Sequence, residues 1–254
     1  MAAVIHTEDL AVSFDGVTPI FEGLNVAIEK GEFVAVVGVS GAGKSTLLRV
    51  VADLIQPFRG RVKIDADVDR TRLAIAMVFQ AANLMPWRRV KDNITLGLEG
   101  LDVDDTIKEE RVRWTLGLVE LDEMAERWPH QLSGGQRQRI GIARALAVDP
   151  DILLMDEPFG ALDAITRGVL QDELLRIWRE TGKSILFVTH DIEEAAYLGD
   201  RILLLGGKPA GIIEEYPVNM DRSKRRETKA FVDLVEEVRN GLQTAIMAAA
   251  EGSN

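Results

Sequence analysis

A glycine-rich turn between residues 38 and 45 carries the residue types that bind nucleotide phosphates. The segment Gly38–Ser45 has the spacing G-x-x-x-x-G-K-[ST], whose glycines let the backbone wrap closely around an anion. Backbone N–H groups then form a nest for phosphate oxygens, the Lys44 ammonium reaches the β- and γ-phosphates, and the Ser45 hydroxyl binds Mg²⁺. The alternative is a glycine-rich turn without chemical function. It is disfavoured because a buried strand precedes the turn and an amphipathic helix follows it, so the sequence predicts nucleotide binding.

Two adjacent carboxylates follow a second apolar run. Asp156 and Glu157 come directly after residues 152–155, at the carboxyl end of a predicted strand, where ligands of open α/β sheets gather. Alternation along the strand sends the two side chains in different directions, so Asp156 suits the metal of a Mg-nucleotide and Glu157 suits polarising the attacking water. The alternative is that both acids cap the helix after Pro158. Exchange of the two roles between Asp156 and Glu157 also remains open.

A third segment has the features of an anion-binding helix terminus. Ser133 is a natural N-cap, and Gly134 and Gly135 leave the backbone bare at the positive end of the helix dipole. The same three residues also fit a plain capped helix, and taken alone they favour that simpler interpretation.

Strands and helices alternate along the chain, which predicts an α/β fold with a mostly parallel core. The helix after the glycine-rich turn has apolar residues on one face as far as Leu54 and Ile55, and Pro57 and Gly60 are expected to end it. The predicted strands cover residues 10–14, 24–28, 33–37, 73–79, 152–155, 184–189 and 202–205. A helical insertion is expected over residues 90–128, and a tail helix over residues 230–247.

Composition limits the function classes. The 254 residues include 46% hydrophobic and 28% charged residues and no cysteine, which is typical of a globular protein of a reducing compartment. The net charge of −11 argues against a nucleic-acid partner, because phosphate backbones are held by basic surfaces. No stretch of about eighteen apolar residues is present, and the amino terminus lacks the pattern of a signal peptide. We therefore expect a cytosolic protein without a membrane anchor.

Together these segments resemble the ATP-binding-cassette (ABC) ATPases. Gly38–Ser45 is similar to their Walker A loop, residues 152–156 to Walker B, and residues 132–136 to the signature loop. Gln80 resembles the Q-loop glutamine, and residues 160–163 resemble the D-loop. His190 resembles the switch histidine, and Phe14 lies where the family stacks an aromatic ring on adenine. The resemblance implies a P-loop NTPase fold with an antiparallel amino-terminal subdomain and an inserted helical subdomain.

The family's mechanism implies that two copies pair head to tail around ATP and Mg²⁺. Each ATP is then held between Walker A of one chain and the signature loop of the other, where Ser133 and Gly135 touch the γ-phosphate. His190 would bind the same phosphate and help place Glu157 and the water. The implied catalytic residues are Glu157, His190, Gln80 and Lys44, and the implied metal ligands are Ser45, Gln80 and Asp156. The implied nucleotide contacts are Phe14, Gly38, Ser40, Gly41, Ala42, Gly43, Lys44, Ser45, Thr46, Ser133, Gly134, Gly135, Gln136 and Asp163.

A finer resemblance points to the ATPases of nitrate, sulfonate and taurine importers. It rests on residues 78–80, 83–87 and 156–163, above all on the Pro86-Trp87 pair. Such a subunit works at the cytoplasmic face of the cell membrane with an integral membrane permease and, indirectly, an extracytoplasmic substrate-binding protein. Leu84, Met85 and Trp87 are candidates for the permease groove, with a place in the core as the alternative. An exporter or lipid-trafficking ATPase, or a soluble ABC ATPase acting on nucleic acid, are the competing functions.

The resemblance also divides the chain. We expect an ABC ATPase domain over residues 1–218, with the helical subdomain at about 89–136, and a helical tail over residues 219–254. A basic run opens this tail at Arg222, Lys224, Arg225 and Arg226. A solvated helix face is the favoured interpretation of this run, and an approach to acidic lipid headgroups is the alternative.

Overall fold

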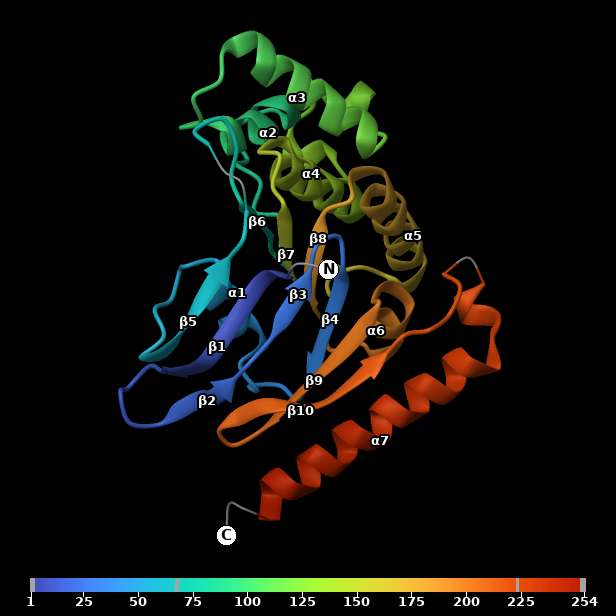
Figure 1. Cartoon of the computed structure of the whole chain (residues 1–254). Helices are drawn as coiled ribbons and strands as arrows, with labels where there is room; N and C mark the ends of the chain where they lie inside the picture. Colours follow the sequence, from blue (N-terminus) through green and yellow to red (C-terminus); the bar gives the residue numbers. More distant parts are fainter. Residues whose placement is uncertain (1–2, 67–68, 223, 252–254) are drawn as a thin grey trace. The chain divides into compact units, whose positions relative to one another are not determined.

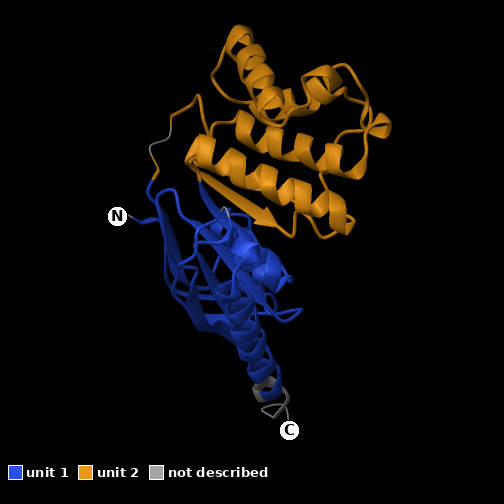
Figure 2. Ribbon diagram, turned by 90° about the vertical axis from the view of Figure 1, so that its right-hand side faces the viewer, with its two compact units in different colours: residues 1–65, 184–254 blue, residues 66–183 orange. Residues whose placement is uncertain are grey.

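The structure is a computed structural model that describes residues 3–66, 69–222 and 224–251. Two compact units are present, one of residues 1–65 and 184–254 and the other of residues 66–183 (Figure 2). We call them unit 1 and unit 2 and describe each by itself. The domain boundaries expected from the sequence stay a prediction.

The strands of unit 1 form one mixed sheet (Figure 1). In spatial order they are β3 (Ala27–Glu29), β1 (Ala3–Ser13), β2 (Pro19–Leu24), β10 (Ala210–Pro217), β9 (Arg201–Gly207), β4 (Phe33–Gly38) and β8 (Ser184–Val188), with β5 (Arg59–Ile64) paired to β1. β1 is antiparallel to β2, β3 and β5, whereas β4 lies between two parallel neighbours, β8 and β9. Every residue of β4 is buried, which explains its continuous apolar run.

The helix after the glycine-rich turn is shorter than its apolar pattern predicted. This helix, α1 (Lys44–Val51), ends with Ala52 as its C-cap, and Leu54 beyond it is 64% exposed. The expectation that the helix continues toward Pro57 and Gly60 is therefore wrong. The Asp53 backbone at φ +59° turns the chain away from helical geometry before the proline is reached.

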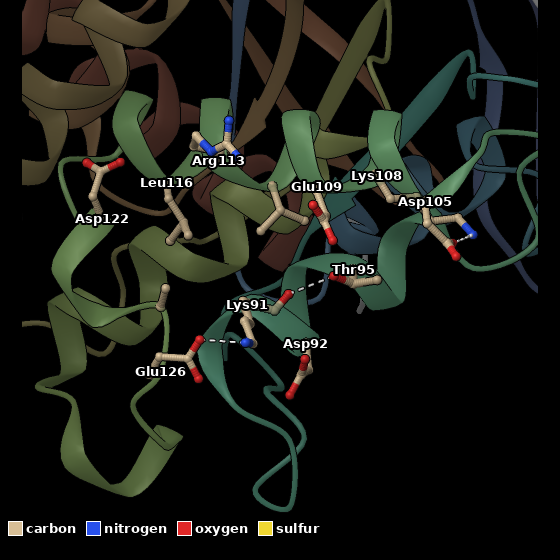
Figure 3. A pocket seen from close by; sticks show the side chains of 12 residues that line it. Lys91, Asp92, Thr95, Asp105, Lys108, Glu109, Arg113, Leu116, Asp122 and Glu126 are labelled. Atoms are coloured by element: carbon tan, nitrogen blue, oxygen red, sulfur yellow. Dashed lines mark hydrogen bonds and ion pairs between the residues drawn. The ribbon is translucent and has the colours of Figure 1, made fainter.

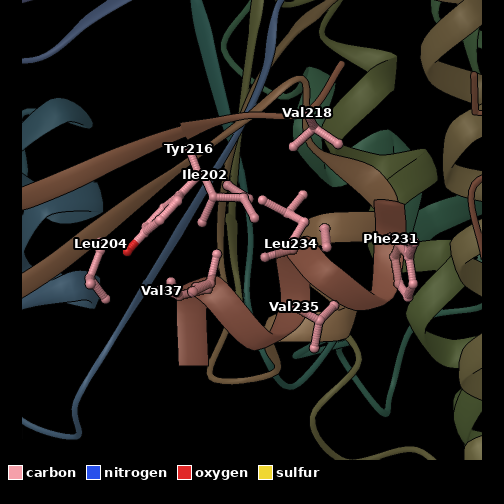
Figure 4. Close-up of a cluster of buried hydrophobic side chains, with 12 residues drawn as sticks. Val37, Ile202, Leu204, Tyr216, Val218, Phe231, Leu234 and Val235 are labelled. Atoms are coloured by element: carbon pink, nitrogen blue, oxygen red, sulfur yellow. The ribbon is translucent and has the colours of Figure 1, made fainter. Parts of the chain in front are cut away.

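The tail helix α7 (Lys229–Glu251) is part of the hydrophobic core of unit 1. Phe231, Leu234, Val235 and Val238 pack with Ile202 and Leu204 of β9 in a single buried cluster (Figure 4). The same cluster includes residues of α6 (Ile192–Leu198), the short helix that follows β8. Helix formation over residues 230–247 is confirmed, with one additional residue at the start and four at the end.

Two arginines of the basic run before α7 are packed against the protein, whereas Lys224 and Arg226 are exposed. Arg225 lies in a short 3₁₀ helix (Arg225–Glu227) and is only 2% exposed. Its guanidinium donates hydrogen bonds to the carbonyl oxygens of Tyr197 and Gly199, both at 2.8 Å. Arg222 likewise donates to the Leu198 carbonyl oxygen at 2.7 Å. These arginines satisfy the carbonyl groups that the end of α6 leaves without helical partners, which corrects the sequence interpretation.

Unit 2 combines a parallel strand pair with helices. β6 (Ile75–Val78) and β7 (Ile152–Asp156) are paired in parallel. The helices are α2 (Val90–Leu98), α3 (Asp105–Leu118), α4 (Gly134–Ala147) and α5 (Ala164–Thr181), with 3₁₀ turns at Asp122–Met124 and Pro129–Gln131. The helical insertion predicted over residues 90–128 is confirmed as α2 and α3. Within residues 3–66, 69–222 and 224–251, no helix has both the length and the apolar character needed to cross a membrane.

Candidate nucleotide site

The glycine-rich loop of unit 1 is built into close contacts that only glycine allows. Gly38 ends β4 beside Leu205 of β9, and a Cβ atom on Gly38 would lie 2.2 Å from the Leu205 carbonyl oxygen. Gly43, the residue before α1, has φ +84°, and a Cβ there would lie 2.7 Å from Ile20 Cγ2. These two glycines therefore fix where the loop leaves the sheet and where the helix begins.

Lys44 is held inside the loop that it follows. Its side chain is 8% exposed, and Nζ donates hydrogen bonds to the carbonyl oxygens of Gly38 at 2.9 Å and Val39 at 3.1 Å. A buried ammonium at the amino terminus of a helix concentrates positive charge at one place. This arrangement attracts the phosphate groups that the sequence pattern predicts.

Phe14 is displayed by a hydrogen-bonded turn at the end of β1. The Asp15 carboxylate accepts hydrogen bonds from the backbone N–H groups of Thr18 at 2.7 Å and Val17 at 2.9 Å, and from the Ser13 hydroxyl at 2.7 Å. These hydrogen bonds, the one from Thr18 first, lower the pKa of Asp15. Phe14 itself is 69% exposed, as a ring available for stacking must be. The sequence analysis did not single out Asp15, so its anchoring role was missed.

His190 comes from the strand next to the glycine-rich loop. β8 pairs in parallel with β4, and the Thr189 N–H donates to the Val36 carbonyl oxygen at 3.1 Å. His190 is exposed directly after this contact, and Asp191 then caps α6 by accepting from the Glu194 N–H at 3.1 Å. Unit 1 thus places His190 and the glycine-rich loop after the carboxyl ends of adjacent parallel strands.

Unit 2 brings Gln80 and the two acids to one edge. β6 and β7 run in parallel with Val78 opposite Met155, so Gln80 and Glu157 each lie two residues beyond this pair, and Asp156 is the last residue of β7. Glu157 has φ +45°, a conformation that is unusual for glutamate and turns the chain sharply after the strand. A Cβ atom built on Gly160 would lie 3.1 Å from Gln80 Nε2 and 3.6 Å from Glu157 Oε2. Both side chains therefore lie over Gly160.

The amino terminus of α4 is a reciprocal capping box. Ser133 Oγ accepts from the Gln136 N–H at 3.2 Å, and Gln136 Oε1 accepts from the Ser133 N–H at 2.9 Å. The predicted N-cap is confirmed. Gly134 and Gly135 lie in the first turn, where helical geometry provides no partner for the backbone N–H groups. Binding of an anion by these groups stays a prediction.

Asp163 is the N-cap of α5 and lies beside the same segment. Its carboxylate accepts from the Thr166 N–H at 3.0 Å and the Thr166 hydroxyl at 2.7 Å, and these bonds lower its pKa. A Cβ atom on Gly134 would lie 3.5 Å from Leu162 Cδ2. Residues 132–136 and 160–163 are thus neighbours within unit 2, which their separation in the sequence does not reveal.

Two residues of α4 that the sequence analysis missed hold the backbone on both sides of Gln80. Gln138 Nε2 donates to the Phe79 carbonyl oxygen at 3.1 Å, and Arg144 donates to the carbonyl oxygens of Ala82 at 2.6 Å and Asn83 at 3.1 Å. The hydrogen-bond partners are backbone atoms, which every residue has, so no residue pattern predicts these contacts.

A pocket of about 380 Å³ is lined by Gln80, Leu84, Gly134, Gln138 and Leu162 among others.

A second concavity lies between α2 and α3. This groove has a volume of about 620 Å³ and is lined mainly by charged side chains around Val112 and Leu116 (Figure 3). Trp87 is 70% exposed beside α2, whereas Leu84 and Met85 are half-buried. The core alternative is therefore wrong for Trp87.

The residues predicted to bind Mg²⁺ each carry an oxygen donor. Among residues 3–66, 69–222 and 224–251 there is no group of three or more His, Cys, Asp or Glu side chains that is able to hold a metal. Mg²⁺ commonly takes one or two protein oxygens and completes its shell with phosphate and water. The Ser45 hydroxyl, the Gln80 amide oxygen and the Asp156 carboxylate have the hard-oxygen chemistry that this requires.

Comparisons with known proteins agree with these features. The family model described as "ABC transporter" matches residues 21–160. The taurine import ATP-binding protein TauB of Escherichia coli O157:H7 is 42% identical over 208 residues, which are 82% of this chain and 82% of TauB. The aliphatic sulfonates import ATP-binding protein SsuB of Bacillus cereus is 39% identical, with 93% of this chain and 100% of SsuB covered.

A solved dimeric structure of the ATP-binding cassette MJ0796, in a post-hydrolysis state bound to ADP and Pi, has a similar fold. Its TM-score is 0.71 at 33% identity, with 85% of this chain and 100% of that chain covered. The mixed sheet, the helical region and the glycine-rich loop are therefore those of an ABC cassette. The chain belongs to the ABC transporter family and is one of its ATPase subunits.

Proposed function

We propose that this chain hydrolyses ATP to energise an importer of small anions such as taurine, aliphatic sulfonates or nitrate. The similarity to TauB and SsuB over most of each chain supports the import function and the sulfonate class. The transported compound does not touch an ATPase subunit, so its selection lies with the membrane and extracytoplasmic partners.

The Walker A loop binds the triphosphate of ATP. Residues 38–46 wrap the phosphates with backbone N–H groups, Lys44 moves its ammonium from the loop carbonyls to the β- and γ-phosphate oxygens, and Phe14 stacks on the adenine. Ser45, Gln80 and Asp156 would hold Mg²⁺. When bound, this ion neutralises phosphate charge during the reaction. The single observation that carries the proposal is Lys44, whose buried ammonium points into the loop at 2.9 Å from the Gly38 carbonyl oxygen.

Glu157 acts as the general base. Its position directly after a strand end, together with Gln80 over Gly160, supports a role in accepting a proton from the water that attacks the γ-phosphorus. His190 donates a hydrogen bond to the γ-phosphate and helps orient Glu157 and the water. The proton leaves the water as the new P–O bond forms, and the β–γ bridging oxygen departs with ADP.

The functional state is a head-to-tail homodimer with two ATP molecules at its interface. Each γ-phosphate then lies between Walker A of one chain and the first turn of α4, with Ser133 and Gly135, of the other. ATP supplies the negative charge that draws two positive helix termini together, and hydrolysis removes that attraction. The dimeric MJ0796 structure, bound to ADP and Pi, supports the pairing of two such chains.

The groove between α2 and α3 is the docking surface for the permease. Its rim is mainly charged, its floor is formed by the buried Val112 and Leu116, and the exposed Trp87 lies beside α2. Aromatic anchors surrounded by polar groups are typical of protein interfaces. The subunit would thus sit peripherally at the cytoplasmic face of the cell membrane.

Copurification tests this function. The tagged chain, isolated from its own cells in mild detergent, is expected to bring down a small integral membrane protein, and its ATPase rate is expected to rise with taurine or a sulfonate plus the binding protein. The Trp87→Ala variant should lose the membrane partner, whereas Trp114→Ala, a matched change at a half-exposed tryptophan of α3, should keep it. Recovery of ribosomes, nucleic acid or an exporter permease in place of the importer partner would contradict the proposal.

A further inference from the structure

α4 and α5 are in contact at their first turns. Gly135 of α4 faces Thr166 of α5 so closely that a Cβ atom on Gly135 would lie 2.7 Å from Thr166 Cγ2 and 3.7 Å from Leu170 Cδ1. Thr166 is itself fixed, because its hydroxyl donates to the Asp163 carboxylate. The Gly135 backbone at the start of α4 therefore packs against Thr166, whose hydroxyl binds the N-cap residue Asp163 of α5.

A buried ion pair joins the same two helices farther along. Arg139 Nε of α4 lies 2.8 Å from Glu173 Oε2 of α5, and the two side chains are 18% and 7% exposed. Arg139 also donates to the Val119 carbonyl oxygen at 3.2 Å, and Arg176 of α5 donates to the Leu118 carbonyl oxygen at 2.6 Å. Both arginines thus bind the end of α3 as well, so three helices meet at this cluster.

The two contacts act at different points of the same pair of helices. A single contact permits rotation of one helix against the other, whereas two contacts separated along the axes prevent it. α4 has 14 residues and α5 has 18, and side chains packed between them leave few alternative arrangements. The Arg139 and Glu173 side chains are both largely buried at this contact, so separation of the helices would leave each of them without its partner.

We propose that Thr166, Arg139 and Glu173 are positioning residues that lock the signature segment (residues 132–136) to the D-loop (residues 160–163), so that both reach the neighbouring chain's nucleotide as one body. The inference rests on the proposed head-to-tail function. It implies that Glu173 acts on the ATP of the partner chain and leaves the ATP bound by its own Walker A loop unaffected.

Two-tag heterodimers test this direction of action. In the first heterodimer, one chain carries Glu157→Gln and the other carries Glu173→Ala. The site with an intact Glu157 is then completed by an unaltered signature segment. In the second heterodimer, one chain is unaltered and the other carries both changes, so the site with an intact Glu157 is completed by the altered segment. Single-turnover phosphate release is measured for both.

The reference is a heterodimer in which one chain carries Glu157→Gln and the other is unaltered. The first heterodimer is expected to release phosphate at the rate of this reference, and the second is expected to be slower by about 10- to 100-fold. Equal rates in the two heterodimers, or the reverse order, would overturn the inference. The same pair of heterodimers with Ser133→Arg in place of Glu173→Ala is the control. If this control shows no asymmetry, the head-to-tail function itself fails. If the control is asymmetric and Glu173→Ala is not, only the lock is refuted.

The Gly135–Thr166 contact provides a second test if Glu173→Ala does not fold, as judged by circular dichroism. Gly135→Ala inserts a methyl group against Thr166 Cγ2, and hydrolysis is expected to fall about tenfold or more. Thr166→Ser removes that Cγ2 while keeping the hydroxyl that bonds Asp163, so Gly135→Ala/Thr166→Ser should recover most of the rate. If the double variant stays as slow as Gly135→Ala, the contact does not position the signature segment.

Discussion

Gln80 and Glu157 converge on Gly160, where a Cβ atom would lie 3.1 Å from the Gln80 amide nitrogen and 3.6 Å from a Glu157 carboxylate oxygen. The two side chains come from the ends of adjacent parallel strands, and the bare backbone of Gly160 leaves room for both. The proposed general base Glu157 therefore lies beside Gln80, where the segment that leads to the exposed Trp87 begins.

Gly160→Ala tests this convergence. The new methyl group displaces the Gln80 amide, so turnover is expected to fall about tenfold while ATP affinity is retained. Gly168→Ala is the matched control, because a Cβ atom on Gly168 meets nothing within 4 Å. Steady-state ATPase and fluorescent-nucleotide binding measure the two quantities. Equal turnover in both variants would show that Gly160 has no special role.

Glu157→Gln removes the proposed base while keeping the side chain's shape. Hydrolysis is expected to drop about 10²- to 10⁴-fold, with ATP binding nearly unchanged and an ATP-bound dimer accumulating. Phosphate release measures the hydrolysis rate, and light scattering measures the mass of the dimer. Near-normal hydrolysis would remove Glu157 as the base.

Phe14→Ala removes the ring proposed to stack on adenine. Base stacking contributes about 1–3 kcal/mol, so ATP affinity is expected to fall by about 5- to 150-fold. Val17→Ala, at an 83% exposed position of the same turn, is expected to leave affinity unchanged. Isothermal titration compares the two, and similar affinities would argue against stacking.

Arg225→Met tests the cap on α6. The change leaves several buried carbonyl groups without donors, and the free energy of unfolding is expected to fall by about 2–4 kcal/mol. Arg226→Met removes a guanidinium that lies over the Tyr197 ring at an exposed site, which predicts a loss below about 1 kcal/mol. Urea denaturation measures both, and equal losses would contradict the capping role.

Glu173 gives the stability of the fold a distinctive pH dependence. Burial, opposed by Arg139 and Arg176, raises the pKa of Glu173 to about 7, and the nearby Glu120 adds to the rise. The folded protein then binds more protons than the unfolded chain between the two pKa values, so this contribution to stability is complete below about pH 4.5 and is lost as pH rises through 7.

Relative to Glu173→Gln, the unaltered protein is expected to lose on the order of 3 kcal/mol of unfolding free energy over that range. Urea denaturation at a series of pH values measures the difference between the two proteins. Parallel profiles would show that Glu173 does not titrate in this way.

The sequence predicted the parts of the site that rest on strand ends and helix caps. The loop after β4, the two acids at the end of β7 and the Ser133 cap follow from local patterns of hydrophobicity and capping. The convergence on Gly160 and the contact between Gly135 and Thr166 depend on how segments far apart in the sequence pack, which no local pattern reports.

Three further features could not be predicted correctly from the sequence, each for a physical reason. Arg225 binds backbone carbonyl groups, which every residue has, so its partners leave no signature in the sequence. β5 (Arg59–Ile64) has no fully buried residue, so no regular apolar alternation marks it as a strand. The carboxyl end of α1 was predicted too late in the sequence, because Leu54 and Ile55 continue the helical spacing of apolar residues beyond the last helical residue.

The most direct measurement is a structure of Glu157→Gln with ATP and Mg²⁺. The account predicts a dimer in which each γ-phosphate contacts Lys44 of one chain and the Ser133 and Gly135 segment of the other. A nucleotide surrounded by residues of a single chain, with residues 132–136 facing solvent, would contradict it.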